Sequence, residues 1–146
     1  MIDQKGQSLV EMIVIIGMVV LLATGIVAGT TMSLSRSKTA QTRSEALAFA
    51  QAGIELTRTK RDQGWDAFVI FGSPAGTYCV GSDGIFGQRQ TSCTVANINN
   101  IYTRSIALTL QTVNEVEVMN VVSLVSWGDQ SLSNQVHLAT YLTQWR

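Results

Sequence analysis

A glycine and a glutamate stand just before the longest apolar run of the chain, where both residue types can take part in chemistry. Gly6 precedes Glu11, and the run that follows, Met12 to Ala28, contains no charged residue. A secretory signal would place its cleavage site after the apolar core. Cleavage after Gly6 would instead remove only the polar leader, residues 1–6, and leave a free amine on Gln7. Because a carboxylate in hydrocarbon is costly and usually paired or functional, Glu11 is the first candidate for a functional residue.

Two cysteines are the next candidates for chemistry. Cys79 and Cys93 are the only cysteines, and their spacing matches neither a zinc knuckle nor a CxxC redox motif. In a chain exported across a membrane, an intramolecular disulfide is favoured over two free thiols. Closing a loop of about 15 residues would contribute about 3 kcal/mol in the chain-entropy model.

Catalytic and metal-binding patterns are missing from the sequence. His137 is the only histidine, and it alternates with apolar residues as an exposed strand residue would. No serine, cysteine or carboxylate stands at a suggestive spacing from it, and HExxH, P-loop, GxSxG and GxGxxG motifs do not occur. The aspartates are scattered and read as solvated turn residues: Asp62, Asp66, Asp83 and Asp129. We therefore expect no enzyme activity, no metal and no cofactor.

The composition suits one small domain with a large apolar segment. The chain has 146 residues, of which 46% are hydrophobic and 14% charged, and its formal net charge is zero. Soluble domains usually carry about 25% charged residues. Neither Lys nor Arg forms a block, so nucleic-acid binding through a basic surface is not expected.

One long helix must carry the N-terminal residues. No proline interrupts the chain from Ser8 to about Asp62, and Asp62-Gln63-Gly64 reads as a helix stop. The first half is apolar all round, whereas the second half is amphipathic. Its apolar stripe contains Leu47, Ala50 and Ile54, with Ala46 and Gly53 beside it. Gly25 and Gly29 form a GxxxG pattern, which indicates either close helix approach in a membrane or simple flexibility.

The rest of the chain predicts an antiparallel sheet. Residues 65–100 are irregular, with short strands expected around Tyr78 to Val80 and Ile85 to Phe86. Residues 101–146 alternate as three strands in a meander. Its expected features are a strand over 102–111, a turn at Val113-Asn114-Glu115, a strand over Val116 to Trp127 with a bulge near Met119 and Asn120, a turn at 128–131, and a last strand ending at Trp145. Trp65, Trp127 and Trp145 are expected in the core or at its rim. One face of this sheet should pack on the amphipathic half of the helix and bury Leu47 and Ile54, which gives an α+β fold.

The N-terminal residues carry a family resemblance. Gly6-Gln7-Ser8-Leu9-Val10-Glu11, followed by Met12-Ile13-Val14-Ile15-Ile16-Gly17, resembles the cleavage and methylation motif of type IV pilins and pseudopilins. The resemblance implies that a prepilin peptidase cuts after Gly6 and N-methylates Gln7. The family usually has phenylalanine at that position. It also implies that Glu11 pairs with the amine of Gln7 on a neighbouring subunit during assembly.

The resemblance implies an organisation for the whole chain. A type IV pilin-like subunit would comprise a leader over 1–6, a membrane or filament-core helix over 7–34, an amphipathic half over 35–64, a connecting region over 65–100 and a sheet over 101–146. The family often has a proline in the first helical half, where the helix partly melts on assembly. Because this chain has none there, Gly25 and Gly29 are the candidates for that weak point.

The implied function is structural. The chain would be a subunit of a type IV pilus or a type II secretion-like filament. It resembles a minor pilin or pseudopilin more than a major pilin, because its cysteines lie in the connecting region. Its implied partners are other pilin subunits, the prepilin peptidase, a platform protein and a motor ATPase. It would sit in the cytoplasmic membrane and then in a surface or periplasmic filament.

An alternative orientation and an alternative function stay open. Lys5 lies on the side that should stay cytoplasmic, whereas Arg36, Lys38 and Arg43 would have to cross, so a positive-inside count alone favours the opposite orientation. The resemblance takes precedence over that count here. A single-span anchored binding domain that keeps its leader and never polymerises is the alternative function.

Overall fold

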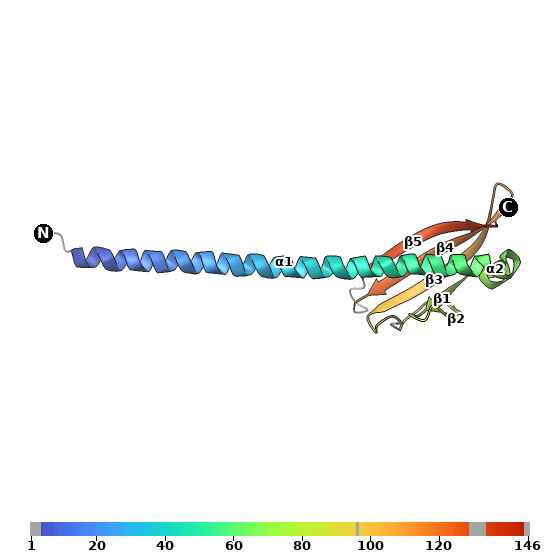
Figure 1. The fold of residues 1–146 in the computed structure, drawn as a ribbon, viewed down its shortest axis with the longest axis horizontal. Coiled ribbons are helices and arrows are strands. Elements are labelled where there is room, and N and C mark those ends of the chain that lie inside the picture. The colour runs from blue at the N-terminus through green and yellow to red at the C-terminus, as the bar shows by residue number, and fades with distance from the viewer. Residues whose placement is uncertain (1–3, 96, 129–133, 145–146) are drawn as a thin grey trace. The chain divides into compact units, whose positions relative to one another are not determined.

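The computed structural model describes residues 4–95, 97–128 and 134–144, with side chains from Leu9 onward. Two helices and five strands follow one another along the chain (Figure 1): α1 (Gln4–Asp62), α2 (Trp65–Gly72), β1 (Gly76–Val80), β2 (Phe86–Gln90), β3 (Tyr102–Val113), β4 (Val116–Trp127) and β5 (Asn134–Thr143). They form two compact units, Met1–Gln41 and Thr42–Arg146. The predicted α+β class, with a long N-terminal helix packed on an antiparallel sheet, is confirmed.

Helix α1 ends where the sequence predicts. Lys60 and Arg61 occupy its last turn, where positive charge complements the helix dipole. Gly64 follows with a φ of 151°, a conformation that L side chains rarely adopt. Glycine at this position therefore lets the chain turn from α1 into α2.

The sheet has the strand order β2-β1-β3-β4-β5, and every neighbouring pair is antiparallel. The expected meander is its β3-β4-β5 part. Asn114 and Glu115 join β3 to β4 with φ values of 49° and 66°. Positive φ at both central residues is the pattern of a two-residue hairpin turn, as predicted here. Of the turn expected at 128–131, residues 129–131 lie outside the described residues, and so does Trp145.

The predicted bulge in β4 is wrong. The β3–β4 register runs without a shift from Tyr102 opposite Trp127 to Val113 opposite Val116, and the β4–β5 register is equally regular. Apolar residues occur on both faces near Met119 because β4 is a central strand. Val118 points away from Met119 and is still only 7% exposed, since Gln111 and Thr143 flank it on the neighbouring strands.

The region between α1 and β3 is more regular than the sequence indicates. β1 and β2 lie close to the two short strands expected there, and α2 was not predicted. Phe68 and Gly72 of α2 are buried, and a Cβ on Gly72 would contact Met119 of the sheet. The apolar run of α2 is too short to show helical periodicity, so its helix is fixed by this packing.

The sheet-facing stripe of α1 is made of small residues. Its buried members are Ala46, Ala50, Gly53, Ile54 and Thr57. The burial of Ile54 was predicted, but Leu47 is 39% exposed, so its predicted burial is wrong. Small side chains let the helix backbone approach the sheet, which leaves the larger Leu47 at the edge of the contact.

Two apolar clusters lie between α1 and the sheet, separated by a polar layer. One contains Ile54, Ile106 and Val121, with Trp65 packed against it, and the other contains Ala50, Tyr102 and Val125, with Trp127 packed against it. Along β3, Arg104 lies between Tyr102 and Ile106, and along β4, Ser123 lies between Val121 and Val125. Gly53 faces both polar residues from α1. We call Gly53, Arg104 and Ser123 the polar layer.

We expect Gly53→Ala to lower the free energy of unfolding by about 1–2 kcal/mol, although alanine favours a helix by about 1 kcal/mol over glycine. The new methyl group would overlap Ser123 Oγ and lie 3.3 Å from Ser123 Cβ. Denaturant unfolding of the full chain in detergent, followed by tryptophan fluorescence, would measure the loss. Removing the hydroxyl in Gly53→Ala/Ser123→Ala should recover part of it.

Gly25→Ala is the matched control, because a Cβ there has nothing within 4 Å. We expect this variant to be at least as stable as the wild type, because it gains helix propensity without a clash. A Gly53→Ala chain that is as stable as the wild type would contradict the close approach of α1 to Ser123.

Candidate functional site

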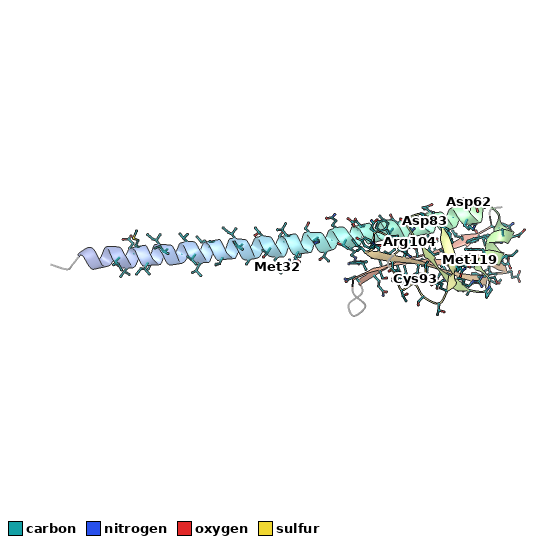
Figure 2. All side chains as sticks on the ribbon, turned by 90° about the horizontal axis from the view of Figure 1, so that it is seen from below. Met32, Asp62, Asp83, Cys93, Arg104 and Met119 are labelled. Atoms are coloured by element: carbon teal, nitrogen blue, oxygen red, sulfur yellow. A yellow bond between two sulfur atoms is a disulfide. The ribbon has the colours of Figure 1, made fainter. Side chains whose placement is uncertain are left out.

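The first unit of the chain is the N-terminal part of α1, and its large apolar side chains between Leu9 and Leu34 are exposed. The exposed fraction of these large apolar residues ranges from 49% for Val14 to 73% for Leu21. They project all round the helix (Figure 2). The described residues contain one helix long and apolar enough to cross a membrane by length and composition. Residues 12–35 carry no charge, and at 1.5 Å per residue they span about 36 Å, more than the roughly 30 Å of a hydrocarbon core.

Hydroxyl groups in this segment are satisfied inside the helix. Thr24 Oγ1 donates to the carbonyl of Val20 at 3.0 Å, and Thr30 Oγ1 donates to that of Val27 at 2.9 Å. Thr31 makes the same kind of bond. An unsatisfied polar group in hydrocarbon costs several kcal/mol. Because these donors already have acceptors, the threonines do not oppose burial in lipid or against other helices.

The predicted assembly residues lie on one helical segment. Gly6, Gln7 and Glu11 all fall within α1, and the Glu11 side chain is exposed. Residues four apart on a helix lie on the same face. Gln7 and Glu11 therefore lie on the same face of the helix. Because the Glu11 side chain is exposed, its carboxylate is accessible to a group from another molecule. The side chain of Gln7 lies outside the described part of the chain.

The predicted weak point has no contacts of its own. α1 continues through Gly25 and Gly29, and a Cβ on either glycine would have nothing within 4 Å. The two glycines make a shallow, open strip on the helix surface. Their role as a weak point stays a prediction.

The predicted disulfide is present. Cys79 of β1 is bonded to Cys93, with the two Cα atoms 5.7 Å apart. The bond ties the segment after β2 to β1. His137 is exposed on β5, and no group of three His, Cys, Asp or Glu residues in the described ranges could hold a metal ion.

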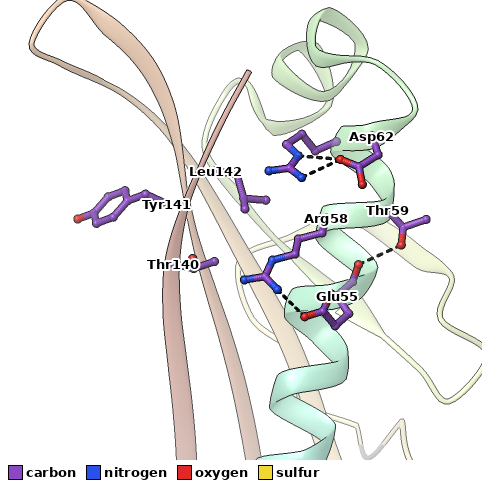
Figure 3. Close-up of a pocket in the computed structure, with 8 residues that line it drawn as sticks. Glu55, Arg58, Thr59, Asp62, Thr140, Tyr141 and Leu142 are labelled. Carbon is purple, nitrogen blue, oxygen red and sulfur yellow. Dashed lines mark hydrogen bonds and ion pairs between the residues drawn. The ribbon is translucent and has the colours of Figure 1, made fainter. Parts of the chain in front are cut away.

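A surface cleft of about 500 Å³ opens between the end of α1 and β5 (Figure 3). Two ion pairs line it. Arg58 Nη1 lies 2.6 Å from Glu55 Oε1, and Arg61 Nη2 lies 2.8 Å from Asp62 Oδ1. Leu142 points toward α1 and Tyr141 points away from it. Because the charges that line the cleft are paired with each other, it does not resemble a site for a charged ligand.

Arg104 is the residue of unusual chemistry that the sequence interpretation missed. It is 3% exposed, and its guanidinium donates to the carbonyls of Val80 at 3.1 Å, Phe49 at 3.3 Å and Gly81. Burial lowers the pKa of Arg104, and nearby Asp83 partly offsets the change. Its even-numbered position, in step with Ile106 and Leu108 on β3, is the signal that could have identified it.

Asn97 holds the backbone of Arg104. Its Oδ1 accepts from Arg104 N at 2.8 Å, and its Nδ2 donates to Arg104 O at 2.9 Å. Through the hydrogen bonds of its own side chain to Phe49 and Val80, Arg104 joins β3 to α1 and β1. Each of its three side-chain nitrogens donates to a protein carbonyl, so its role in the described structure is to hold the fold.

Tyr102 gives the fold a measurable pH dependence. Its hydroxyl donates to Glu45 Oε2 at 2.8 Å. Burial, followed by the hydrogen bond to Glu45 and its charge, raises the pKa of Tyr102 to about 12. The unfolded pKa is about 10. This contribution to stability is therefore complete below about pH 10 and is lost as the pH rises toward 12.

We expect Tyr102→Phe to remove this alkaline fall in the free energy of unfolding. Denaturant titrations of wild type and variant at several pH values between 9 and about 11.5 would test it. Tyr141→Phe is the control, because Tyr141 is 63% exposed. An alkaline fall of equal size in Tyr102→Phe would contradict the assignment.

Comparison with known proteins adds no relative. No protein-family model, no curated protein and no solved structure matches this chain. The N-terminal segment and the fold are therefore the basis for a proposed function.

Proposed function

We propose that this chain is a prepilin-like structural subunit of a type IV pilus or a type II secretion-like filament. The observation that carries the proposal is α1 itself. Its first part exposes apolar side chains on all sides and follows the Gly6 to Glu11 motif, and its second part packs on an antiparallel sheet. An all-apolar surface of this length needs either lipid or other helices around it. A subunit that moves from membrane to filament uses both in turn.

The proposed cycle begins in the cytoplasmic membrane. A prepilin peptidase removes the leader after Gly6, which leaves a positively charged amine on Gln7. Glu11 of one subunit then attracts the amine of another, because opposite charges attract strongly where water is excluded. A platform protein and a motor ATPase would drive assembly. We propose no enzyme activity and no cofactor for the chain.

The first test is the mass of the mature N-terminus. We expect the chain from its native host to begin at Gln7, with or without one added methyl group. A chain that retains Met1 or Ile2 would instead support a single-span anchored domain that does not polymerise.

The second test is Glu11→Ala. We expect the variant to insert in the membrane normally and to be depleted from sheared filaments by on the order of tenfold or more, since a buried amine loses its partner. Glu55→Ala is the matched control, because Glu55 is an exposed glutamate on the same helix that pairs with Arg58 of that helix. Filament levels of Glu11→Ala equal to those of Glu55→Ala would contradict the proposed pairing.

A further inference from the structure

The two faces of the sheet differ in what covers them. Both described helices of the unit Thr42–Arg146 pack on the inner face, which carries Tyr102, Ile106 and Val121. The opposite face consists of the odd-numbered residues of β3 and β5, the even-numbered residues of β4, and Thr77 and Cys79 of β1. We call it the outer face. Figure 3 shows Tyr141 of this face pointing away from α1.

The outer face contains no Asp, Glu, Lys or Arg. The charged residues described in the same unit lie on the helices, in turns and loops, on β2, or on the inner side of the sheet, as Arg104 and Glu117 do. A solvent-facing protein surface commonly carries about 25–35% charged residues. Depletion of charge is instead typical of the centre of an interface between proteins.

The side chains of the outer face can pair with copies of themselves. Its central row places Val122 between Ala107 and Ala139. The next row aligns Thr109, Asn120 and Tyr141. Hydroxyl and amide groups both donate and accept hydrogen bonds. Two such faces can therefore satisfy one another, whereas a charged face would repel its own copy.

We propose that the outer face binds the outer face of a second copy of this chain. The flat row of Ala107, Val122 and Ala139 would lie at the centre, as in two sheets packed about 10 Å apart. The residues of the face approach the roughly 20 to 30 that each partner contributes to an interface of standard size. A contact of this kind is isologous, so the same residues meet from both copies.

A lipid surface fits the outer face less well. The face offers no basic side chain for a lipid phosphate, and its threonine, serine and asparagine groups would lose their water against acyl chains. The proposal concerns the unit Thr42–Arg146 and stands independently of filament assembly through α1.

Sedimentation equilibrium of the full chain in detergent tests the proposal. We expect concentration-dependent dimers, and we expect Ala139→Lys to raise the dissociation constant by on the order of tenfold or more, because an unpaired charge at the centre of the contact would lose its water. Ala139 is exposed, so the lysine should be accepted by the monomer fold. Thr109→Lys, on β3, is a second variant with the same expected effect.

Gln51→Lys is the matched control, since Gln51 is exposed on α1 away from the sheet, and we expect it to leave the dissociation constant unchanged. A wild-type chain that stays monomeric up to about 1 mM, a weak limit for association, would overturn the proposal. A dimer that survives both outer-face lysines would also overturn it, because the contact must then lie elsewhere, as on the apolar part of α1. A monomeric wild type whose β5 is protected from hydrogen exchange by neutral phosphatidylcholine vesicles, with that protection lost in Ala139→Lys, would identify lipid instead and equally overturn it, since α1 inserts in both chains.

Discussion

Replacing Arg104 with leucine is expected to lower the free energy of unfolding by about 3 kcal/mol. The guanidinium donates to three carbonyls, those of Phe49, Val80 and Gly81. Leucine would leave these acceptors without that donor in a buried place, and each unsatisfied group costs about 1–3 kcal/mol. Relief of the cost of burying the arginine offsets part of the loss. Because small domains are stable by only about 5–15 kcal/mol, the change is large.

Arg89→Leu provides the matched control. Arg89 Nη2 also donates to two carbonyls, those of Phe71 at 3.2 Å and Ser73 at 3.3 Å, but the side chain is exposed. Water can replace it, so we expect a loss below about 1 kcal/mol. Denaturant unfolding of both variants in detergent gives the comparison. Equal losses would show that burial of Arg104 is not what makes it important.

Arg104→Lys separates charge from geometry. Lysine keeps the positive charge but presents a compact ammonium in place of the planar guanidinium fork. It cannot reach the carbonyls of α1 and β1 together. We therefore expect stability between that of the wild type and that of Arg104→Leu, and a lysine variant equal to the wild type would contradict the role of the fork.

Removing the disulfide with Cys79→Ala/Cys93→Ala is expected to cost about 3 kcal/mol, the chain-entropy value for a loop of this length. The sequence separation of the pair is 14 residues, and the loop contains β2. That strand pairs only with β1, at three register positions with an irregularity between them. Without the bond, β2 keeps few connections to the sheet.

The loss should therefore be uneven across the sheet. Hydrogen exchange of the full chain, followed by mass spectrometry, should show faster exchange in β2 and in residues 91–95, with β3 and β4 little changed. β5 is the internal control, because it is the other edge strand of the same sheet. Equal acceleration at both edges would contradict a local role for the bond.

The sequence predicts the regular elements well because their patterns are long. α1 and the strands β3 and β4 each repeat a period over many residues, so Tyr102 to Trp127 could be placed closely. α2 was missed because it covers only Trp65–Gly72. The bulge was wrong because apolar residues on both sides of β4 reflect its central place in the sheet. Neighbouring strands shield Val118 without any shift of register.

The errors at the helix–sheet contact have a different origin. Hydrophobicity favours Leu47 as a buried residue, but the distance between α1 and the sheet is set by Gly53 and Ser123. The alternation along β3 places Arg104 on the buried face, but the charge of its side chain favours the surface unless carbonyl partners are available to it. The Gly6 to Glu11 segment shows the opposite limit, because its predicted chemistry needs a second molecule. Within one chain these residues lie on α1, and their proposed pairing forms only between two subunits.

The polar layer also has a mechanical consequence. Gly53 fits over Arg104 and Ser123, whereas the neighbouring turns of α1 present Ala50 and Thr57. A pull along the axis of α1 would drag a side chain onto Ser123 and break the bond from Arg104 to the Phe49 carbonyl. The polar layer would therefore resist sliding of α1 along the sheet, and a tension applied to the helix would be transmitted to the sheet at this point.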